Sequence, residues 1–198
     1  VMSTIARPAT FRPASFGLQQ ATRQVVSAAP FGGSEQAVDL LNDRWLASVE
    51  LPIMVRADAA ATEAFIASMR GQTNVVALYH FARPVPRGTM RASPTVSGAH
   101  SAGASILNIT AGTANSTLLA GDMLGVGSLL LMVAADITLN GSGAGAVSIT
   151  NRLRTALSGG AAISWSQPSA LFRMLNAPAI TYLPGIGSGV AIDFGEAI

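Results

Sequence analysis

The chain has 198 residues, of which 49% are hydrophobic and only 11% are charged, whereas about a quarter of the residues in an average soluble domain are charged. This composition is too apolar for a disordered chain, and the length suffices for one domain, or two small ones, with a hydrophobic core. The sequence has no cysteine and only two histidines, which excludes disulfide scaffolds, thiol nucleophiles and cysteine-ligated zinc or iron–sulfur sites.

The charge pattern argues against a nucleic-acid binder. The basic residues are all arginines, spread from Arg7 to Arg173, and the formal net charge is only +2. Nucleic-acid-binding domains instead gather Lys and Arg on one face. A surface with so few charges is typical of a protein that faces other copies or other proteins, so we expect a self-associating subunit.

No segment predicts a membrane partner. The most apolar stretch, residues 123–135, is shorter than the roughly 20 residues of a spanning helix and is interrupted by glycines. The first residues lack the apolar segment of a signal peptide. We therefore expect a soluble protein made in the cytoplasm.

The first 40 residues are expected to be extended. Residues 1–20 have no periodicity and fit an arm or an edge strand. Residues 22–29 and 35–40 are strand candidates on either side of a glycine-containing turn at residues 30–34. The second of these strands can pair back on the first.

Residues 44–51 form the clearest predicted strand. Apolar and polar residues alternate with a period of two, which indicates a half-buried strand. Trp45 lies on the apolar side and is expected to anchor the core of the first domain.

Residues 58–70 predict a helix, followed by a strand at residues 74–81. Asp58 or Thr62 can cap the start of the helix, and Gly71 can adopt the left-handed conformation that ends it. Its apolar stripe is expected to contain Ala61, Ala64, Phe65, Ile66 and Met69.

Residues 83–94 interrupt this pattern. Three prolines surround Gly88, so neither a helix nor a regular strand is expected there. Short strand candidates with glycine-containing turns follow at regular spacing, which is typical of a small β-barrel or β-sandwich. They lie at residues 105–110, 128–134, 146–150, 161–166 and 170–175.

A last strand at residues 190–198 can return to the first domain. The sequence thus predicts a mainly β chain in which residues 1–91 and 176–198 form one domain, with the helix on its flank. Residues 92–175 are predicted to form an inserted small β domain.

Residues 141–146 match the GxGxxA variant of a dinucleotide-binding fingerprint. That fingerprint requires a following helix, whereas here β-branched residues follow and Asn140-Gly141 is a hairpin-turn signal. We expect a solvent-exposed hairpin tip over residues 140–145.

No group of residues predicts catalysis, a cofactor or a metal. His80 lies in a strand-like run and is expected to be packed or hydrogen-bonded, and His100 has no acid near it in sequence. Asp122 is expected to stabilise a turn. Asp193 and Glu196 are offset along a strand, so they are not expected to form a carboxylate pair, and no enzyme is predicted.

A series of short motifs runs along the chain in a characteristic order. Among them is a turn of the Pro-Phe-x-Gly type that precedes an Arg-Trp strand. The motifs are residues 23–27 (RQVVS), 30–36 (PFGGSEQ), 44–45 (RW), 69–71 (MRG), 86–89 (PRGT), 119–122 (LAGD), 153–154 (LR), 170–174 (ALFRM) and 192–197 (IDFGEA). In this order they resemble the distal tail proteins of tailed bacteriophages. The chain departs from that family's pattern at residues 41–43 (LND), where the family often has a glycine.

This resemblance implies a structural virion protein that assembles in the host cytoplasm. Such proteins form a ring, typically a hexamer, that joins the tail tube to the tail tip or baseplate. It implies a tube-like β-sandwich with one flanking helix and a second β domain that projects outward. The implied partners are other copies, the tail tube protein and the tail tip or baseplate hub proteins, with DNA only as passing cargo and no cofactor.

Two functional alternatives remain open. The 92–175 domain could bind a carbohydrate receptor, although Trp165 and Phe172 are its only aromatic residues. A cell-wall hydrolase is disfavoured by the absence of cysteine and of paired acids.

The arginines of the linker, Arg83, Arg87 and Arg91, are the candidate subunit-interface residues. Their guanidinium groups could pair with carboxylates of an adjacent copy. The alternatives are a solvated linker and arginines that face DNA in the tube.

Overall fold

The computed structural model describes residues 2–28, 32–33, 35–40 and 42–197. It confirms a mainly β chain, with one α-helix among the described residues. That helix, α1 (Arg56–Met69), has 14 residues. Within the described part of the chain, no helix combines the length and the hydropathy needed to cross a membrane.

The first domain is built on a five-stranded antiparallel sheet. The strand order is β1-β4-β18-β15-β6. The last strand therefore returns to the first domain and lies at the centre of the sheet, between β4 and β15, as predicted. The strands are β1 (Ser15–Ala21), β4 (Arg44–Leu51), β18 (Val190–Glu196), β15 (Ser169–Met174) and β6 (Val76–Tyr79).

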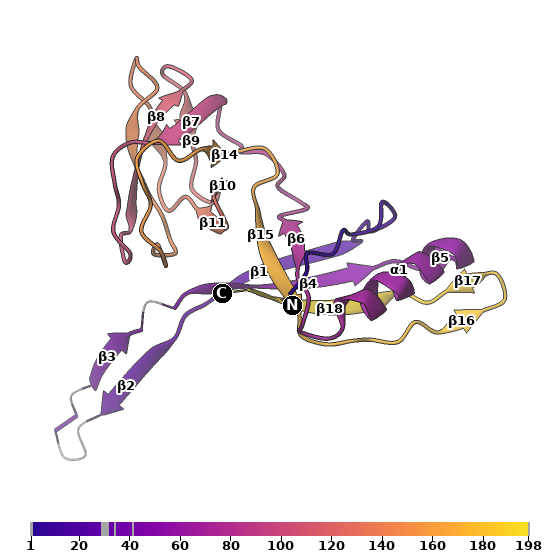
Figure 1. Cartoon of the computed structure of the whole chain (residues 1–198). Helices are drawn as coiled ribbons and strands as arrows, with labels where there is room; N and C mark the ends of the chain where they lie inside the picture. The colour runs from indigo at the N-terminus through magenta and orange to yellow at the C-terminus, as the bar shows by residue number, and fades with distance from the viewer. Residues whose placement is uncertain (1, 29–31, 34, 41, 198) are drawn as a thin grey trace.

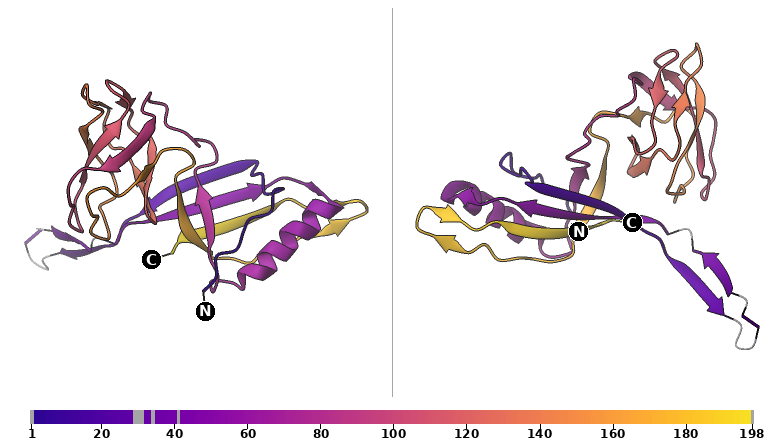
Figure 2. Two further views of the ribbon diagram at one scale, coloured as in Figure 1. Left: turned by 45° about the horizontal axis from the view of Figure 1, so that its top comes forward. Right: turned by 180° about the vertical axis from the view of Figure 1, so that it is seen from behind.

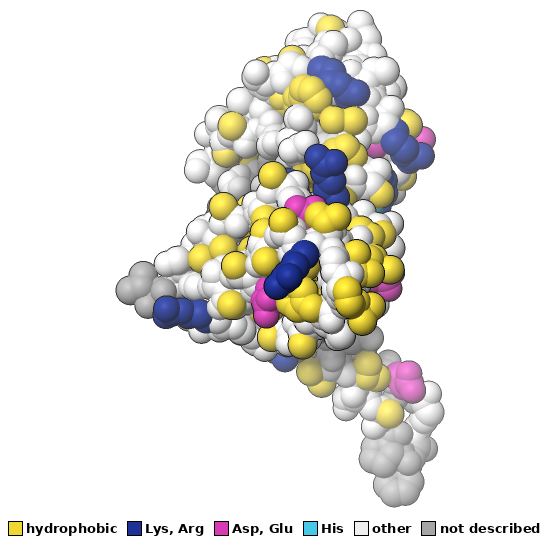
Figure 3. Space-filling view, turned by 90° about the vertical axis from the view of Figure 1, so that its right-hand side faces the viewer, with side chains coloured by type: hydrophobic (Ala, Val, Ile, Leu, Met, Phe, Trp, Pro, Cys, Tyr) yellow, Lys and Arg dark blue, Asp and Glu magenta, His cyan; other side chains and the backbone are white. Residues whose placement is uncertain are grey.

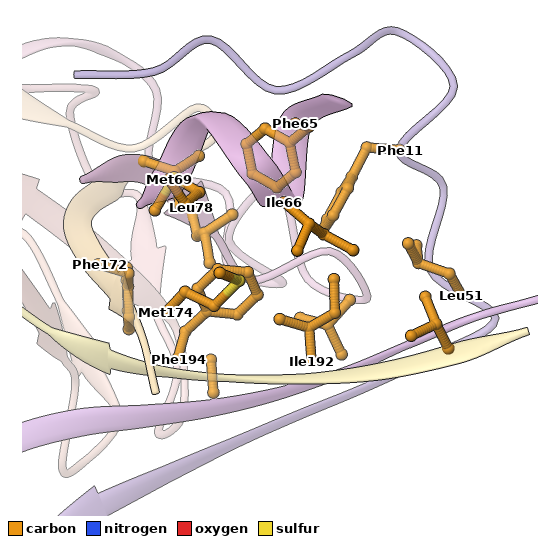
Figure 4. Packing of buried hydrophobic residues seen from close by; sticks show 14 of the residues in the cluster. Phe11, Leu51, Phe65, Ile66, Met69, Leu78, Phe172, Met174, Ile192 and Phe194 are labelled. Atoms are coloured by element: carbon orange, nitrogen blue, oxygen red, sulfur yellow. The ribbon is translucent and has the colours of Figure 1, made fainter. Parts of the chain in front are cut away.

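Helix α1 covers one face of this sheet and encloses the first core. The alternation of β4 is as predicted, with Trp45, Ala47, Val49 and Leu51 all buried. Figure 4 shows Phe65, Ile66 and Met69 of the helix above the side chains of the sheet, among them Ile192 and Phe194. The helical stripe is completed by Ala59 and Thr62, whereas the predicted Ala61 and Ala64 are exposed.

The predicted helix caps are wrong in detail. Val55 precedes the helix in an extended conformation without a side-chain cap, and Thr62 instead donates a hydrogen bond to the Asp58 carbonyl (2.9 Å). The N–H of Arg56 bonds to the carbonyl of Gly185 (3.3 Å), so a contact from a distant segment satisfies the helix start. At the other end, Gly71 adopts the predicted left-handed conformation, with φ 62°, but Arg70 before it also does so, with φ 49°.

Two small sheets extend from opposite ends of β4 (Figures 1 and 2). At its start, β2 (Gln24–Ala28) and β3 (Glu35–Asp39) form an antiparallel hairpin, as predicted, although residues 30, 31 and 34 of the predicted turn lie outside the described residues. At its end, β5 (Met54–Val55) pairs with β17 (Ile186–Gly187), which pairs with β16 (Tyr182–Leu183).

The middle domain is a second β unit with its own core. One of its sheets has the order β13-β8-β7, another β11-β10-β14, and β12 pairs with β9. The apolar stretch 123–135 contains the hairpin β10–β11. The strands are β7 (Ala92–Val96), β8 (Ile106–Gly112), β9 (Thr117–Leu118), β10 (Met123–Val126), β11 (Leu129–Met132), β12 (Ile137–Thr138), β13 (Gly145–Ser148) and β14 (Ile163–Ser164).

The predicted boundary at residue 175 is corrected. Strand β15, which was assigned to the middle domain, pairs with β6 and β18 of the first sheet, and its Phe172 and Met174 lie in the first core. The chain leaves the first sheet after β6 and re-enters it at the neighbouring strand β15 (Figure 1). The middle domain is thus inserted between two adjacent strands.

Candidate functional site

The candidate site comprises the arginine linker, the joint between the domains and two exposed apolar surfaces. Arg83 opens the linker and contacts both domains. Its Nη1 donates to the carbonyl of Gly121 (2.8 Å), and its Nη2 lies 3.0 Å from Nε2 of His80. Its guanidinium group thus ties the end of β6 to the turn before β10.

Arg87 lies beside the buried carboxylate of Asp122. This carboxylate accepts hydrogen bonds from the backbone N–H groups of Arg87 (2.8 Å), Gly88 (3.1 Å) and Leu119 (2.8 Å). The bond to Leu119 confirms the predicted turn-stabilising role of Asp122. The Arg87 side chain, 59% exposed, donates from Nη2 to the carbonyl of Ala120 (2.6 Å).

Arg91 closes the linker against the middle domain. Its Nη1 donates to the carbonyls of Gly88 (3.0 Å) and Met90 (2.6 Å), and its guanidinium carbon lies 4.9 Å from the centre of the Trp165 ring. Trp165 in turn donates from Nε1 to the carbonyl of Ala92 (2.8 Å).

All three linker arginines therefore bond to carbonyl groups of their own chain. Residues 83–91 contain no helix or strand, as predicted, but the prediction is wrong for residues 92–94, which begin β7. The linker is fastened to the middle domain rather than simply solvated. Of the three side chains, that of Arg87 is exposed and those of Arg83 and Arg91 are half-buried. Their role at a subunit interface stays a prediction.

His80 is a packed histidine, as expected. Its ring lies edge-on to Phe16, with the ring centroids 5.1 Å apart, and its Nδ1 accepts a hydrogen bond from the Arg83 N–H (3.1 Å). Burial, followed by the positive charge of Arg83, lowers the pKa of His80 below its usual 6.5. The neutral ring is thus favoured at neutral pH. His100, in the middle domain, accepts a bond at Nε2 from the Asn108 N–H (3.2 Å).

A buried ion pair joins the two domains, and sequence reasoning missed it. Arg154 of the middle domain contacts both oxygens of Glu196 at 2.7 Å. Arg154 also donates to the Asp43 carbonyl (2.9 Å), and the Trp45 N–H donates to Glu196 Oε2 (3.0 Å). Such a forked pair is geometrically specific, but its members are 42 residues apart in sequence.

Trp45 belongs to this joint as well as to the first core. Its indole Nε1 donates to the carbonyl of Leu130 in β11 (2.7 Å). Met123 and Leu130 pack in the first core, whereas Leu124 and Leu131 pack in the second. The hairpin β10–β11 therefore has one face in each core, and the two domains share it.

Asp193 and Glu196 do not form a carboxylate pair, as expected. Glu196 is buried against Arg154, whereas Asp193 is exposed on the sheet face opposite α1 and accepts a bond from Asn176 Nδ2 (3.2 Å). Asp193 also lines a groove of about 580 Å³ along β1, β4 and β18. Among the described residues, no three His, Cys, Asp or Glu side chains gather where they could hold a metal ion.

The two aromatic residues considered for a sugar site are both engaged. Phe172 is 1% exposed and lies in the first core. Trp165 is half-buried and stacks with Arg91. A stacking platform for a carbohydrate needs an open aromatic face, which Phe172 cannot offer.

Residues 140–145 form a turn, as predicted, but they are not a hairpin tip, because the strands on either side pair in different sheets, β12 with β9 and β13 with β8. The Asn140 side chain accepts hydrogen bonds at Oδ1 from the N–H groups of Ser142 (3.0 Å) and Ala144 (2.9 Å). Gly143 is buried against Gly112 with φ +71°, and a side chain there would collide with the Gly112 carbonyl. The dinucleotide-like spacing is thus explained by the turn.

The hairpin β2–β3 is the first exposed apolar surface. Every residue of both strands is exposed. Val25 and Val26 are each 53% exposed and Val38 is 48% exposed. At its base, Asp39 lies 3.6 Å from Arg152 of the middle domain. No polar motif in the sequence indicates this surface. Its signal in the sequence is the short apolar runs of the two strands.

The second exposed apolar surface, the end patch, lies where β5, β16 and β17 meet the start of α1. Figure 3 shows hydrophobic side chains gathered on this end of the first domain. Arg56, Tyr182 and Leu183 also line a groove of about 410 Å³. The end patch is formed by Ile53, Val55, Tyr182, Leu183 and Ile186.

Comparison with known proteins adds no further constraint. No protein-family model matches this sequence, and no curated protein matches it.

Proposed function

We propose that the chain is a structural subunit that assembles with copies of itself into a ring at the distal end of a tailed-bacteriophage tail. The ring joins the tail tube to the tail tip or baseplate. The observation that carries the self-association is the hairpin β2–β3, which exposes its apolar side chains and projects from the body of the domain (Figures 1 and 2).

An isolated two-stranded hairpin is marginally stable in water. Val25 lies opposite Val38 on one face of the hairpin, and Val26 lies opposite Ala37 on the other face. Both faces thus carry apolar side chains that the chain itself leaves exposed. Such a ribbon gains most by inserting between other protein surfaces.

The joint between the domains suits a structural role. A shared hairpin and a buried ion pair hold the middle domain on the first domain. A fixed orientation is what a ring subunit needs in order to present the same projecting domain around an axis.

The identity of the assembly comes from the sequence resemblance to distal tail proteins. It supplies the remaining partners, which are the tail tube protein and the tip or baseplate hub proteins, with DNA as passing cargo. It also supplies the location in the virion tail and a hexameric ring without a cofactor.

The test is native mass spectrometry of the purified chain, with negative-stain electron microscopy. We expect a closed six-fold species. The variant Val25→Ser/Val26→Ser/Val38→Ser is expected to stay folded but monomeric, and Ile106→Ser, at an exposed apolar residue of the middle domain, is the matched control. A wild-type chain that remains monomeric at high concentration would refute the ring.

A further inference from the structure

We infer that the ring is closed by a head-to-tail contact in which the hairpin β2–β3 of one copy lies on the end patch of the next. This inference rests on the proposed self-association and names the two surfaces that meet. The occupant of the end patch is therefore a second copy of this chain.

The two surfaces cannot meet within one chain. The hairpin precedes β4 in the sequence and the end patch follows it, so the eight-residue strand separates them. A strand of that length spans about 26 Å. Figures 1 and 2 show the hairpin pointing away from the end of the domain that carries β5, β16 and β17.

Both surfaces expose several large apolar side chains next to one another. Ile53 is 68% exposed, Val55 59% and Leu183 57% in the end patch. Scattered exposed apolar residues are ordinary, but contiguous groups mark association sites. The valines of the hairpin and the aliphatic residues of the end patch are matched in character.

The charges at the two surfaces are also complementary. Glu35, in β3, is exposed and forms no ion pair within the described part of the chain. Arg56 lies in the groove of the end patch and is likewise in no ion pair among the described residues. The neighbouring Glu63 is already engaged, because it accepts a bond from the Tyr182 hydroxyl (2.7 Å). We therefore pair Glu35 of one copy with Arg56 of the next.

A contact between two different surfaces has consequences for symmetry. Each copy has one hairpin and one end patch. An open row of copies therefore keeps an unoccupied hairpin at one end and an unoccupied end patch at the other. Such heterologous contacts generate closed rings or open filaments, whereas a two-fold dimer requires the same surface on both partners.

Disulfide trapping tests the contact, since the chain has no cysteine of its own. We expect Val26→Cys copies mixed with Leu183→Cys copies to form disulfide-linked dimers under mild oxidation, whereas neither variant alone forms them. The double variant Val26→Cys/Leu183→Cys should form a ladder of linked species on a non-reducing gel. Ile106→Cys, an apolar site of similar exposure on the middle domain (49% against 57% for Leu183), is the matched partner control and should not link to Val26→Cys.

A charge exchange is the second measurement. Glu35→Arg or Arg56→Glu alone should weaken association about tenfold, and the double exchange should restore it. Circular dichroism checks that each variant is folded.

The outcomes separate this inference from the proposed function. Rings without cross-linking in the mixture would overturn the head-to-tail contact and leave the ring intact. Cross-linking of Val26→Cys copies alone would also overturn the contact, because it indicates a symmetric hairpin-to-hairpin dimer. Absence of any oligomer would overturn both.

Discussion

The arginine linker and the β2–β3 hairpin both lie outside the main sheets, but their side chains are in opposite situations. The linker joins the two domains, and the hairpin projects from the first domain. The linker carries three cations and each of them bonds to a carbonyl group of the same chain. The hairpin carries valines, and its strands leave them exposed.

The difference has a physical cause. A guanidinium group has five donors, so it finds acceptors in any nearby turn. An apolar side chain in a two-stranded ribbon has no third layer to pack against. The arginine linker is the predicted interface, yet the β2–β3 hairpin is the segment whose apolar side chains have no packing partner within the described part of the chain. The contrast predicts that stability depends on the braced regions and assembly on the hairpin.

The largest effect on stability is expected at Trp45. Trp45→Ala removes a buried side chain from the core and its bond to Leu130, and should destabilise the fold by roughly 3–5 kcal/mol. Urea denaturation measures the loss. Trp45→Phe keeps most of the packing but loses the indole N–H, and it should lower the free energy of unfolding by only about 1–2 kcal/mol relative to the wild type. Equal stability of Trp45→Ala and wild type would contradict the core role.

The buried ion pair should come next. Arg154→Ala leaves the Glu196 carboxylate buried without its partner, which should cost about 3 kcal/mol. Arg152→Ala, at the exposed pair with Asp39, is the matched control and should change stability by less than about 1 kcal/mol. Similar unfolding midpoints for the two variants would mean that the joint contributes no special stability.

The linker arginines sharpen the comparison directly. The variant Arg83→Gln/Arg87→Gln/Arg91→Gln loses several bonds to carbonyl groups and should lower stability by about 1–3 kcal/mol. Because these groups are satisfied within the chain, rings should still form, as measured by native mass spectrometry. A folded triple variant that fails to assemble would instead support the predicted inter-subunit role of these arginines.

The hairpin is the opposite case. Val25→Ser/Val26→Ser/Val38→Ser changes only exposed side chains, so the free energy of unfolding of the monomer should change by less than about 0.5 kcal/mol. Assembly should nevertheless be lost. If denaturation of the variant shows a large drop in monomer stability, then the hairpin is packed within its own chain after all.

The smallest effect concerns pH. The pKa of His80 is lowered by burial and by Arg83, so the unfolded chain binds a proton more readily than the folded chain does. Stability should therefore decrease as the pH falls below 6.5, the ordinary value of this group, and should level off below the folded pKa. Comparing wild type with His80→Gln at pH 7.5 and 5.5 isolates this contribution. An identical pH dependence for both proteins would show that His80 is not responsible.

The sequence by itself determined the elements whose signal is local. The strict alternation of residues 44–51 gave the bounds of β4, and the apolar stripe with its glycine stop gave α1 to within two residues. Local signals also predicted the hairpin around residue 30, the last strand and the turn at Asn140. Each of these follows from a period or a turn residue, which neighbouring residues are enough to specify.

Only the tertiary structure decided what depends on distant partners. The two-residue strands β5, β16 and β17 are too short to show a period, and β15 looks like any other strand in the regular series until it pairs with β6. The Arg154–Glu196 pair and the side-chain bonds of Arg83 and Arg87 to Gly121 and Ala120 likewise join residues far apart in the chain. A carbonyl acceptor is present at every residue, so the sequence carries no mark of which one an arginine will reach.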